Sequence, residues 1–237
     1  MHDIEVLGHI TGTTYVQKPD IATAVVFRST AERSGDLIVL GPRTRASYNP
    51  GKAARLCVRA RLRPGQARAL LGVSLAELVD RAVPLTDLWG RAAHRLADRM
   101  AADGDDTGRV VERLREAVAV DRGNPLVPAA LGRLTGAARL SEVAARLGVS
   151  ERHLRTVFAR EIGLSPKHVA RINRVHDVLA LAGRRGWAAV AGDAGFFDQA
   201  HMIGDFRSLM GVAPGDFLAG RFPVSTPCGS SYRKPSM

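Results

Sequence analysis

Residues 140–163 read LSEVAARLGVSERHLRTVFAREIG, and the apolar pattern of this stretch decides the fold of the C-terminal half. Apolar side chains recur at helical spacing up to Leu147 and again after Ser150, which is a typical helix-capping residue. Gly148 suits a tight turn between the two helices. The second helix would bury Leu154, Val157, Phe158 and Ile162. Two short helices joined by such a turn form a helix-turn-helix, whose second helix can enter the major groove of DNA.

The outward face of that second helix combines positive charge with small size. It comprises Arg152, Arg155, Thr156 and Ala159. Guanidinium groups bond phosphates and guanine edges, and small neighbours let the helix approach the bases without clashing. The same residues also fit a helical hairpin whose basic face is merely solvated, so this segment alone leaves both interpretations open.

Residues 187–211, WAAVAGDAGFFDQAHMIGDFRSLMG, repeat the layout of the first stretch. A Gly195-Phe196 turn and a capping Asp198 precede the second helix of this copy. Phe206 lies 48 residues after Phe158. A repeat at that period, with a helix predicted over residues 165–182 between the copies, describes two similar units joined by a rod. The rod would be ~27 Å long, which suits recognition helices roughly one DNA turn, about 34 Å, apart.

These two stretches resemble the DNA-binding domain of the AraC/XylS family of bacterial transcription regulators. The second copy matches the family signature in its Gly-Phe turn, in Phe206, and in Gly211-x-x-Pro214 before Phe217. The resemblance covers residues 125–221. It implies an all-α domain of seven helices whose two recognition helices enter adjacent segments of the major groove, with double-stranded DNA as the partner.

The resemblance also implies roles for individual residues. The base-reading positions are Arg152, Arg155 and Thr156 in the first unit and Gln199, Ala200, Ile203 and Gly204 in the second. Gly204 departs from the family pattern, which commonly has a basic or polar residue there, and Ile203 either meets a thymine methyl group or packs locally. We therefore expect the first unit to supply most of the direct readout. The phosphate contacts expected are Ser150, Arg160, Lys167, Arg171, Arg174 and His201, any of which can instead be merely solvated.

The charge of the chain agrees with a polyanionic partner. It carries 34 Lys and Arg against 23 Asp and Glu, a formal net charge of +11. Residues 1–121 hold 18 basic and 15 acidic side chains, whereas residues 122–237 hold 16 and 8. The excess therefore lies mostly in the half that contains the repeated units, although positive charge also serves solubility.

Residues 1–120 predict an α+β domain for sensing or dimerisation. Short apolar runs predict strands at 4–10, 24–27, 37–40 and 56–62, with residues 47–51 among the turns. Helical spacing follows at 66–71, 74–82, 87–102 and 107–120, with Ser74 and Thr86 as caps. The stretch from Leu37 to Gly90 resembles the N-terminal part of one AraC-type subgroup, which implies a partly cupin-like β-domain. Residues 121–125 are the predicted boundary, and residues 222–237 are predicted to be a disordered tail.

The sequence leaves an effector pocket open and argues against a catalytic or metal site. Phe27, Tyr48, Val58 and Trp89 either line a pocket for a small-molecule effector or belong to an ordinary core. We expect no catalytic site, cofactor or metal, because the N-terminal histidines lack ligand spacing and Cys57 stands alone in its domain. The alternatives are a DNA-targeted repair-type enzyme and a helical module that binds no DNA.

The cellular setting is also an expectation. The N-terminus lacks the pattern of a signal peptide, and no apolar stretch reaches the roughly 18 residues of a membrane span. We therefore expect a cytoplasmic protein without a membrane partner. RNA polymerase is a further partner if the chain is an activator, and the sequence leaves open whether the chain is a homodimer, which effector it binds and which operator it reads.

Overall fold

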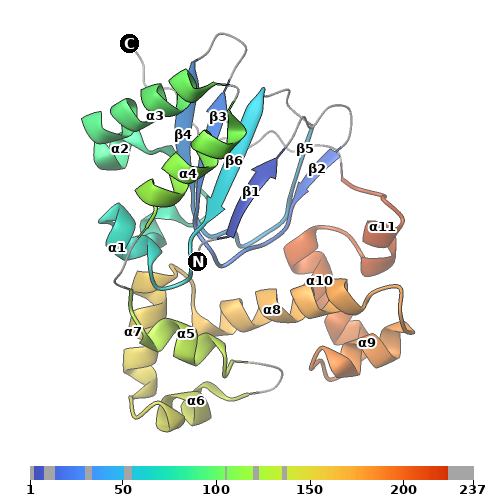
Figure 1. The fold of residues 1–237 in the computed structure, drawn as a ribbon. Helices are drawn as coiled ribbons and strands as arrows, with labels where there is room; N and C mark the ends of the chain where they lie inside the picture. Colours follow the sequence, from blue (N-terminus) through green and yellow to red (C-terminus); the bar gives the residue numbers. More distant parts are fainter. Residues whose placement is uncertain are drawn as a thin grey trace.

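The computed structural model describes residues 3–7, 14–29, 34–50, 55–104, 106–119, 123–134 and 138–223. In the first half, six strands are followed by helices and one further strand, whereas the second half is helical (Figure 1). One buried hydrophobic cluster runs from Val25 to Val118 and a second from Val127 to Met210. The chain therefore has an α+β N-terminal part and an all-α C-terminal part, as the sequence predicted.

A five-stranded antiparallel sheet forms the frame of the N-terminal part. In spatial order its strands are β1 (Asp3–Leu7), β6 (Leu56–Arg61), β3 (Ala24–Ser29), β4 (Gly35–Leu40) and β7 (Ala82–Pro84). Burial alternates along β6, since Val58 and Ala60 are buried while Cys57 and Arg59 are less so. Phe27 lies opposite Val58 in register, and both are fully buried. The alternation therefore fixes which face of the sheet carries the core.

Three strands were not predicted from the sequence. A separate two-stranded sheet pairs β2 (Thr14–Gln17) with β5 (Ser47–Pro50), and β7 adds an edge to the main sheet. The prediction of a turn at residues 47–51 was wrong, because residues 47–50 form β5. Its polar sequence, SYNP, carries no apolar alternation that would reveal a strand. The predicted strand 4–10 ends at Leu7, and residues 8–10 lie outside the described part.

The helices of the N-terminal part are shorter than predicted. They are α1 (Ala67–Leu71), the 3-10 helix η1 (Leu75–Leu78), α2 (Thr86–Trp89), α3 (Arg91–Asp103) and α4 (Thr107–Ala117). The helix predicted over 74–82 was wrong, since η1 stops at Leu78 and the backbone turns at Asp80, whose φ is 56°. The helix predicted over 87–102 is broken at Gly90, which has φ 54° and ψ −130°.

The predicted caps of these helices need correction as well. The side chain of Ser74 makes no capping hydrogen bond, and Leu85, not Thr86, precedes α2. At α4 the side chain of Asp106 accepts a hydrogen bond from the backbone N–H of Arg109. Helices α3 and α4 lie against the sheet (Figure 1) and bury Met100 and Leu114 in its core.

Seven helices occupy the described part of the chain after residue 125. They are α5 (Leu126–Leu131), α6 (Leu140–Arg146), α7 (Glu151–Glu161), α8 (Pro166–Leu181), α9 (Trp187–Asp193), α10 (Gln199–Met210) and α11 (Pro214–Leu218). Helix α8 runs between two helical groups, with α7 near one end and α10 near the other (Figure 1). Its 16 residues span ~24 Å, slightly less than predicted.

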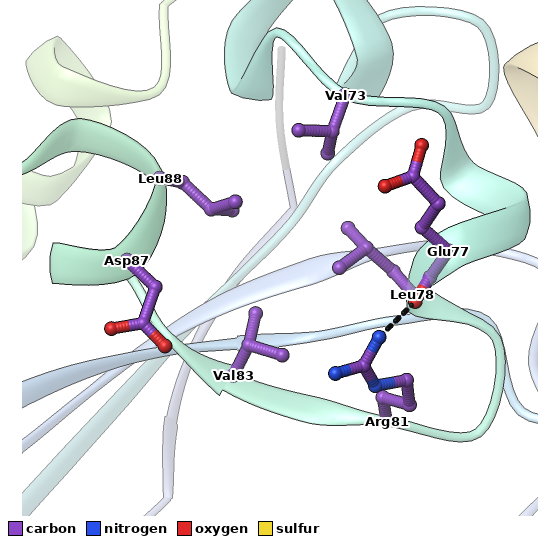
Figure 2. Close-up of a pocket in the computed structure, with 7 residues that line it drawn as sticks. All are labelled: Val73, Glu77, Leu78, Arg81, Val83, Asp87 and Leu88. Atoms are coloured by element: carbon purple, nitrogen blue, oxygen red, sulfur yellow. Dashed lines mark hydrogen bonds between the residues drawn. The ribbon is translucent and has the colours of Figure 1, made fainter. Parts of the chain in front are cut away.

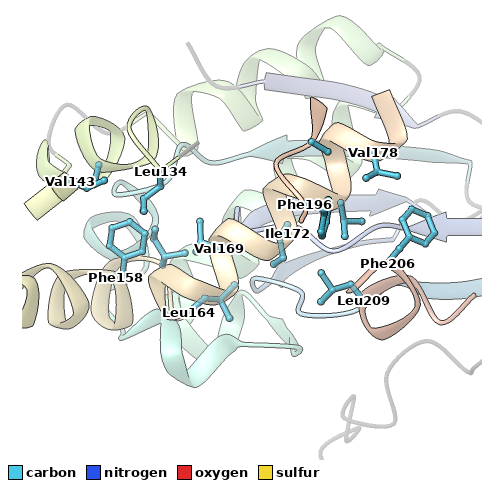
Figure 3. Close-up of a cluster of buried hydrophobic side chains, with 14 of the residues drawn as sticks. Leu134, Val143, Phe158, Leu164, Val169, Ile172, Val178, Phe196, Phe206 and Leu209 are labelled. Carbon is cyan, nitrogen blue, oxygen red and sulfur yellow. The ribbon is translucent and has the colours of Figure 1, made fainter. Parts of the chain in front are cut away.

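One continuous core holds these helices together. Phe158 of α7 and Phe206 of α10 lie toward opposite ends of the cluster, and Val169 and Ile172 of α8 lie between them (Figure 3). Each of these four side chains is at most 1 % exposed. The linking helix is therefore part of the core of both units, which restrains how the units move relative to each other.

The N-terminal part contacts the end of α7. The main-chain oxygen of Leu75 in η1 approaches Gly163 so closely that a Cβ atom there would lie 2.6 Å from it. Arg68 of α1 pairs with Glu161 at 3.6 Å, and the Glu161 side chain is 8 % exposed. The first helix-turn-helix is therefore packed directly against η1 and α1.

Other contacts join the N-terminal part to α8 and α10. The backbone N–H of Ala46 donates to the oxygen of Leu209 at 2.7 Å. Nε2 of His176 in α8 lies 2.7 Å from the oxygen of Pro19. Phe222 packs on Tyr48 with ring centroids 5.3 Å apart. Phe222 was predicted to start a disordered tail and instead closes this contact, while residues 224–237 lie outside the described part.

Candidate nucleic-acid interface

The first helix-turn-helix consists of α6, a four-residue link and α7. Gly148 adopts φ 66°, a left-handed conformation that glycine reaches at little cost. Ser150 is extended, and its side chain accepts a 3.1 Å hydrogen bond from the backbone N–H of His153, as predicted for a cap. Leu154 and Phe158 are fully buried against the shared core. Sequence and packing therefore fix which face of α7 turns outward.

The outward face of α7 carries the predicted base-reading residues. Arg152, Arg155 and Thr156 are all exposed with the N-terminal part in place. Nε of Arg155 donates to a carboxylate oxygen of Glu151 at 3.1 Å, and the hydroxyl of Thr156 donates to the oxygen of Arg152 at 3.0 Å. These local bonds are solvent-exposed, so they can be exchanged for bonds to a ligand at small cost.

The second helix-turn-helix consists of α9, a turn and α10. Gly195 has φ 75°, and Phe196 follows as a buried plug that is 6 % exposed. Asp198 then caps α10 by accepting a 2.7 Å hydrogen bond from the backbone N–H of His201. Met202 and Phe206 turn α10 onto the core. Both units therefore end their turns with a side-chain cap on the recognition helix.

The predicted base-reading positions of α10 differ in exposure. Gln199, Ala200 and Gly204 are exposed, whereas Ile203 is half-buried and packs against the core. Ile203 therefore packs locally at least in part, which is one of the two roles that the sequence left open for it. This outward face carries no Lys or Arg between Gln199 and Gly204, in contrast to the arginine-rich face of α7.

Two of the expected phosphate contacts bridge α8 and α10. Nε of Arg171 donates to Asp205 at 3.0 Å, and Arg174 donates to the other oxygen of that carboxylate at 3.1 Å. Arg171 also donates to the hydroxyl of Ser208 at 3.1 Å, and the guanidinium carbon of Arg174 lies 4.8 Å from the ring centroid of Phe196. In this structure these arginines therefore brace the second recognition helix against the linking helix.

The remaining expected phosphate contacts are on the surface. Arg160, at the end of α7, and Lys167, in the first turn of α8, are exposed. Ser150 is exposed while it caps α7, and His201 is exposed with its ring edge-on to Phe196, 5.4 Å between centroids. Positive side chains are thus available along α7 and at the start of α8.

Comparison with known families identifies this arrangement. The model of the family described as "Helix-turn-helix domain" matches residues 143–220. The match covers both units and the helix between them. The C-terminal part of this chain is an AraC-type helix-turn-helix domain. No relative was found among the curated proteins compared with the chain.

Three solved structures are similar to part or most of this chain. The C-terminal domain of AraT, a response regulator from Geobacillus stearothermophilus, is 22% identical over 48% of this chain and 94% of its own, with a TM-score of 0.39. The DNA-binding domain of AdpA, solved in complex with a target DNA, is 27% identical. The match covers 40% of this chain and 86% of the AdpA domain, with a TM-score of 0.36. ToxT from Vibrio cholerae is 11% identical. The match covers 93% of this chain and 98% of ToxT, with a TM-score of 0.43.

The four residues suggested for an effector pocket lie in different surroundings. Phe27 and Val58 are fully buried in the sheet core. Trp89 is half-buried and donates to the oxygen of Leu70 at 3.2 Å. Tyr48 lies at the contact with α10. Their observed surroundings are those of core and contact residues.

A small pocket of about 160 Å³ does lie beside η1. Its apolar walls are Val73, Leu78, Val83 and Leu88, and its polar lining is Glu77, Arg81 and Asp87 (Figure 2). The guanidinium of Arg81 donates to the main-chain oxygen of Glu77 at 2.8 Å. The same 3-10 helix η1 that lines the pocket with Glu77 and Leu78 approaches Gly163 of the AraC-type domain through Leu75.

The described residues do not favour metal chemistry or a reactive thiol. Within them, no group of three or more His, Cys, Asp and Glu is placed to hold a metal ion. Burial raises the pKa of the Cys57 thiol despite the nearby Arg28 and Arg59, which disfavours the thiolate that a nucleophile needs. None of the described helices has both the length and the apolar character required to cross a membrane.

Sequence reasoning missed one exposed feature of the AraC-type domain. Phe197, between the plug and the cap of the second turn, is 93 % exposed. A signal was present in the sequence: Phe158 and Phe206 are 48 residues apart, whereas Gly148 and Gly195 are 47 apart. The second turn therefore holds one residue more than the first.

Proposed function

We propose that this chain is a sequence-specific DNA-binding transcription regulator that reads adjacent major-groove segments with α7 and α10. The observation that carries this proposal is the pair of capped recognition helices held near the two ends of one helix, with their predicted reading positions largely exposed. A helix-turn-helix presents its second helix to the major groove, and two such helices need a fixed spacing to share one face of a duplex. The core shared by α7, α8 and α10 supports such a fixed arrangement.

The two kinds of contact contribute differently to binding. Arg160, Lys167 and the other cations supply affinity that falls as salt rises, because binding them releases counterions from the phosphates. Arg152, Arg155 and Thr156 supply sequence choice through base edges. Gln199 of α10 is suited to adenine, which an amide bonds at two positions. Binding itself, without catalysis, is the proposed activity.

Control by a small molecule is a further part of the proposal. The N-terminal part contacts α7 through η1 and α10 through Ala46 and Tyr48. An effector changes DNA binding only if its affinity differs between DNA-competent and incompetent states. The pocket beside η1 supports such coupling, because a ligand that displaces η1 also displaces a surface packed on the end of α7.

Assembly and further partners follow from this role. RNA polymerase is the additional partner if the regulator activates transcription, and a homodimer would place two copies of the double unit on one operator. Light scattering of the purified chain with and without its operator measures the number of copies bound. We propose a cytoplasmic location because DNA is the ligand.

Selection of random duplexes on the purified chain tests the proposed function. The enriched duplex is then titrated with the wild-type chain at low and high salt, alongside a scrambled duplex. The double variant Arg152→Ala/Arg155→Ala should lose most of its preference for the enriched duplex. Its matched control is Arg95→Ala/Arg99→Ala, which removes two exposed arginines from α3 and the same net charge.

The expected outcome is one enriched site, salt-sensitive binding and normal specificity in the control variant. An absence of enrichment together with salt-insensitive binding would overturn the proposed function and would favour a helical module that binds protein. Equal loss of specificity in both double variants would show that bulk charge, and not the face of α7, determines the preference.

A further inference from the structure

The two turns of the AraC-type domain differ by one inserted residue. In the first unit the backbone N–H of the plug residue Val149 donates to Ala144, and the cap Ser150 follows directly. In the second unit the plug Phe196 donates to Ala191 in the same way, at 2.9 Å. The cap there is Asp198. The residue between Phe196 and Asp198, Phe197, therefore has no counterpart in the first turn.

The fold gives no reason for a phenylalanine at this position. The plug site is already filled by Phe196, which is 6 % exposed, whereas Phe197 is 93 % exposed. None of the aromatic rings in the described part of the chain packs on Phe197. Burial of a phenylalanine side chain is favourable, because it removes a large apolar surface from water. That gain is unrealised in the free protein and is available to a ligand.

The surroundings of Phe197 favour an uncharged contact with DNA. Phe197 precedes the cap of α10, and the N-terminal residues of a recognition helix are those that contact base edges. The exposed positions that follow, Gln199, Ala200 and Gly204, carry no charge. A Cβ atom at Gly204 would meet nothing within 4 Å, so packing inside the protein does not demand glycine there. Ala200 and Gly204 therefore leave room for a ligand to approach this face of α10 closely.

We infer that Phe197 is a specificity-determining residue that packs its ring on the C5-methyl group of a thymine in the segment read by α10. This inference rests on the proposed function and deepens it. Phenylalanine is among the side chains suited to apolar contact with that methyl group, which in the major groove distinguishes thymine from cytosine. The second unit then selects by methyl contact, while the first selects by hydrogen bonds from arginine.

Replacement of thymine by deoxyuridine tests this contact, because it removes the methyl group and leaves base pairing intact. Each thymine of the enriched duplex is replaced in turn, and affinities are measured for the wild-type chain, Phe197→Ala and Phe197→Leu. We expect one or two positions under α10 at which deoxyuridine weakens wild-type binding about fourfold, as expected for loss of one buried methyl group. Phe197→Ala should bind the unmodified duplex more weakly and be insensitive to deoxyuridine there, while Phe197→Leu should keep part of the sensitivity.

The matched control is Leu218→Ala in α11, which removes another exposed apolar side chain, 49 % exposed, from the same domain. It should bind like the wild type, and Phe197→Ala should keep the wild-type thermal midpoint. If Phe197→Ala retains full affinity and deoxyuridine sensitivity while Arg155→Ala loses specificity, the inference is wrong and the proposed function stands. If Phe197→Ala keeps both yet loses transcription in a reconstituted assay, the ring contacts a protein and the inference is also wrong. If the wild type selects no duplex at all, the proposed function itself fails.

Discussion

The hydroxyl of Tyr48 in β5 donates a 2.5 Å hydrogen bond to the main-chain oxygen of Met210, 162 residues further along the chain. Tyr48 is 3 % exposed and Met210 is fully buried. Burial raises the pKa of Tyr48, so its hydroxyl stays protonated and remains a donor at neutral pH. The bond joins the small sheet of the N-terminal part to the end of the second recognition helix.

Tyr48→Phe should loosen this connection while keeping the ring that packs on Phe222. The free energy of unfolding should fall by about 1 kcal/mol, because the oxygen of Met210 loses a buried partner. The amide of Ala46, which bonds Leu209 beside it, should exchange with solvent faster. Urea unfolding and hydrogen exchange measure these two effects. Unchanged values in both would show that the bond contributes nothing to the attachment.

Asp205→Asn should weaken the brace between α8 and α10. The substitution removes the negative charge that Arg171 and Arg174 share, in a site where the Asp205 side chain is 14 % exposed. We expect a loss of about 1.5–3 kcal/mol in the free energy of unfolding, the range for hydrogen bonds to charged groups. Asp193→Asn serves as control, since its pair with Arg185 is more exposed, at 43 % for Asp193. Equal small losses in both variants would contradict a bracing role for Asp205.

Arg155→Ala should reduce the preference for the enriched duplex over random DNA by about 1–3 kcal/mol, because one base contact is lost. Arg155→Lys should restore charge without restoring the two-point contact, and so should recover little of that preference. Lys167→Ala is the contrast, since Lys167 is an exposed expected phosphate contact and its loss would weaken binding to both duplexes about equally. Competition titrations measure, for each variant, the ratio of its affinities for the enriched and random duplexes. The reverse pattern would mean that the residue taken as a base contact binds phosphate and that the residue taken as a phosphate contact binds a base.

The stability of the chain should depend on His168 below neutral pH. This half-buried residue of α8 bonds the backbone of Thr44, and burial, together with the charge of Arg171, lowers the pKa of His168 below its usual value. The unfolded chain, with an imidazole pKa near 6.5, then binds more protons than the folded chain. Stability is therefore full above about pH 6.5 and falls as the pH decreases toward the folded pKa. Urea unfolding between pH 8 and pH 5 should show this loss, and His168→Gln should flatten it; an identical slope in the variant would exclude His168 as the cause.

The helical half of the fold was predictable because its apolar periodicity is strong and local. Ser150 and Asp198 mark the starts of both recognition helices in the sequence, and both cap them in the structure. The small sheet was not predictable, since β5 is polar and is defined by its pairing with β2. Local pattern likewise gave no warning that Gly90 breaks a helix, because glycine is tolerated inside many helices.

The candidate site was only partly predictable for the same reason. Exposure of Arg152 and Arg155 follows from the helical period around Leu154 and Phe158. The partnership of Arg171 with Asp205 joins residues 34 positions apart and depends on the packing of α8 against α10. Such pairs are set by tertiary structure, which one sequence does not display.

The central claim is that α7 and α10 read two segments of one duplex at a spacing set by α8. Hydroxyl-radical footprinting of the wild-type chain on its enriched duplex tests this most directly. We predict two protected segments about 10 base pairs apart on one face of the duplex, the helical repeat of DNA. Insertion of 5 base pairs between the segments should abolish simultaneous protection, because it rotates one segment to the opposite face. A single protected segment, or two segments that tolerate the insertion, would contradict the claim.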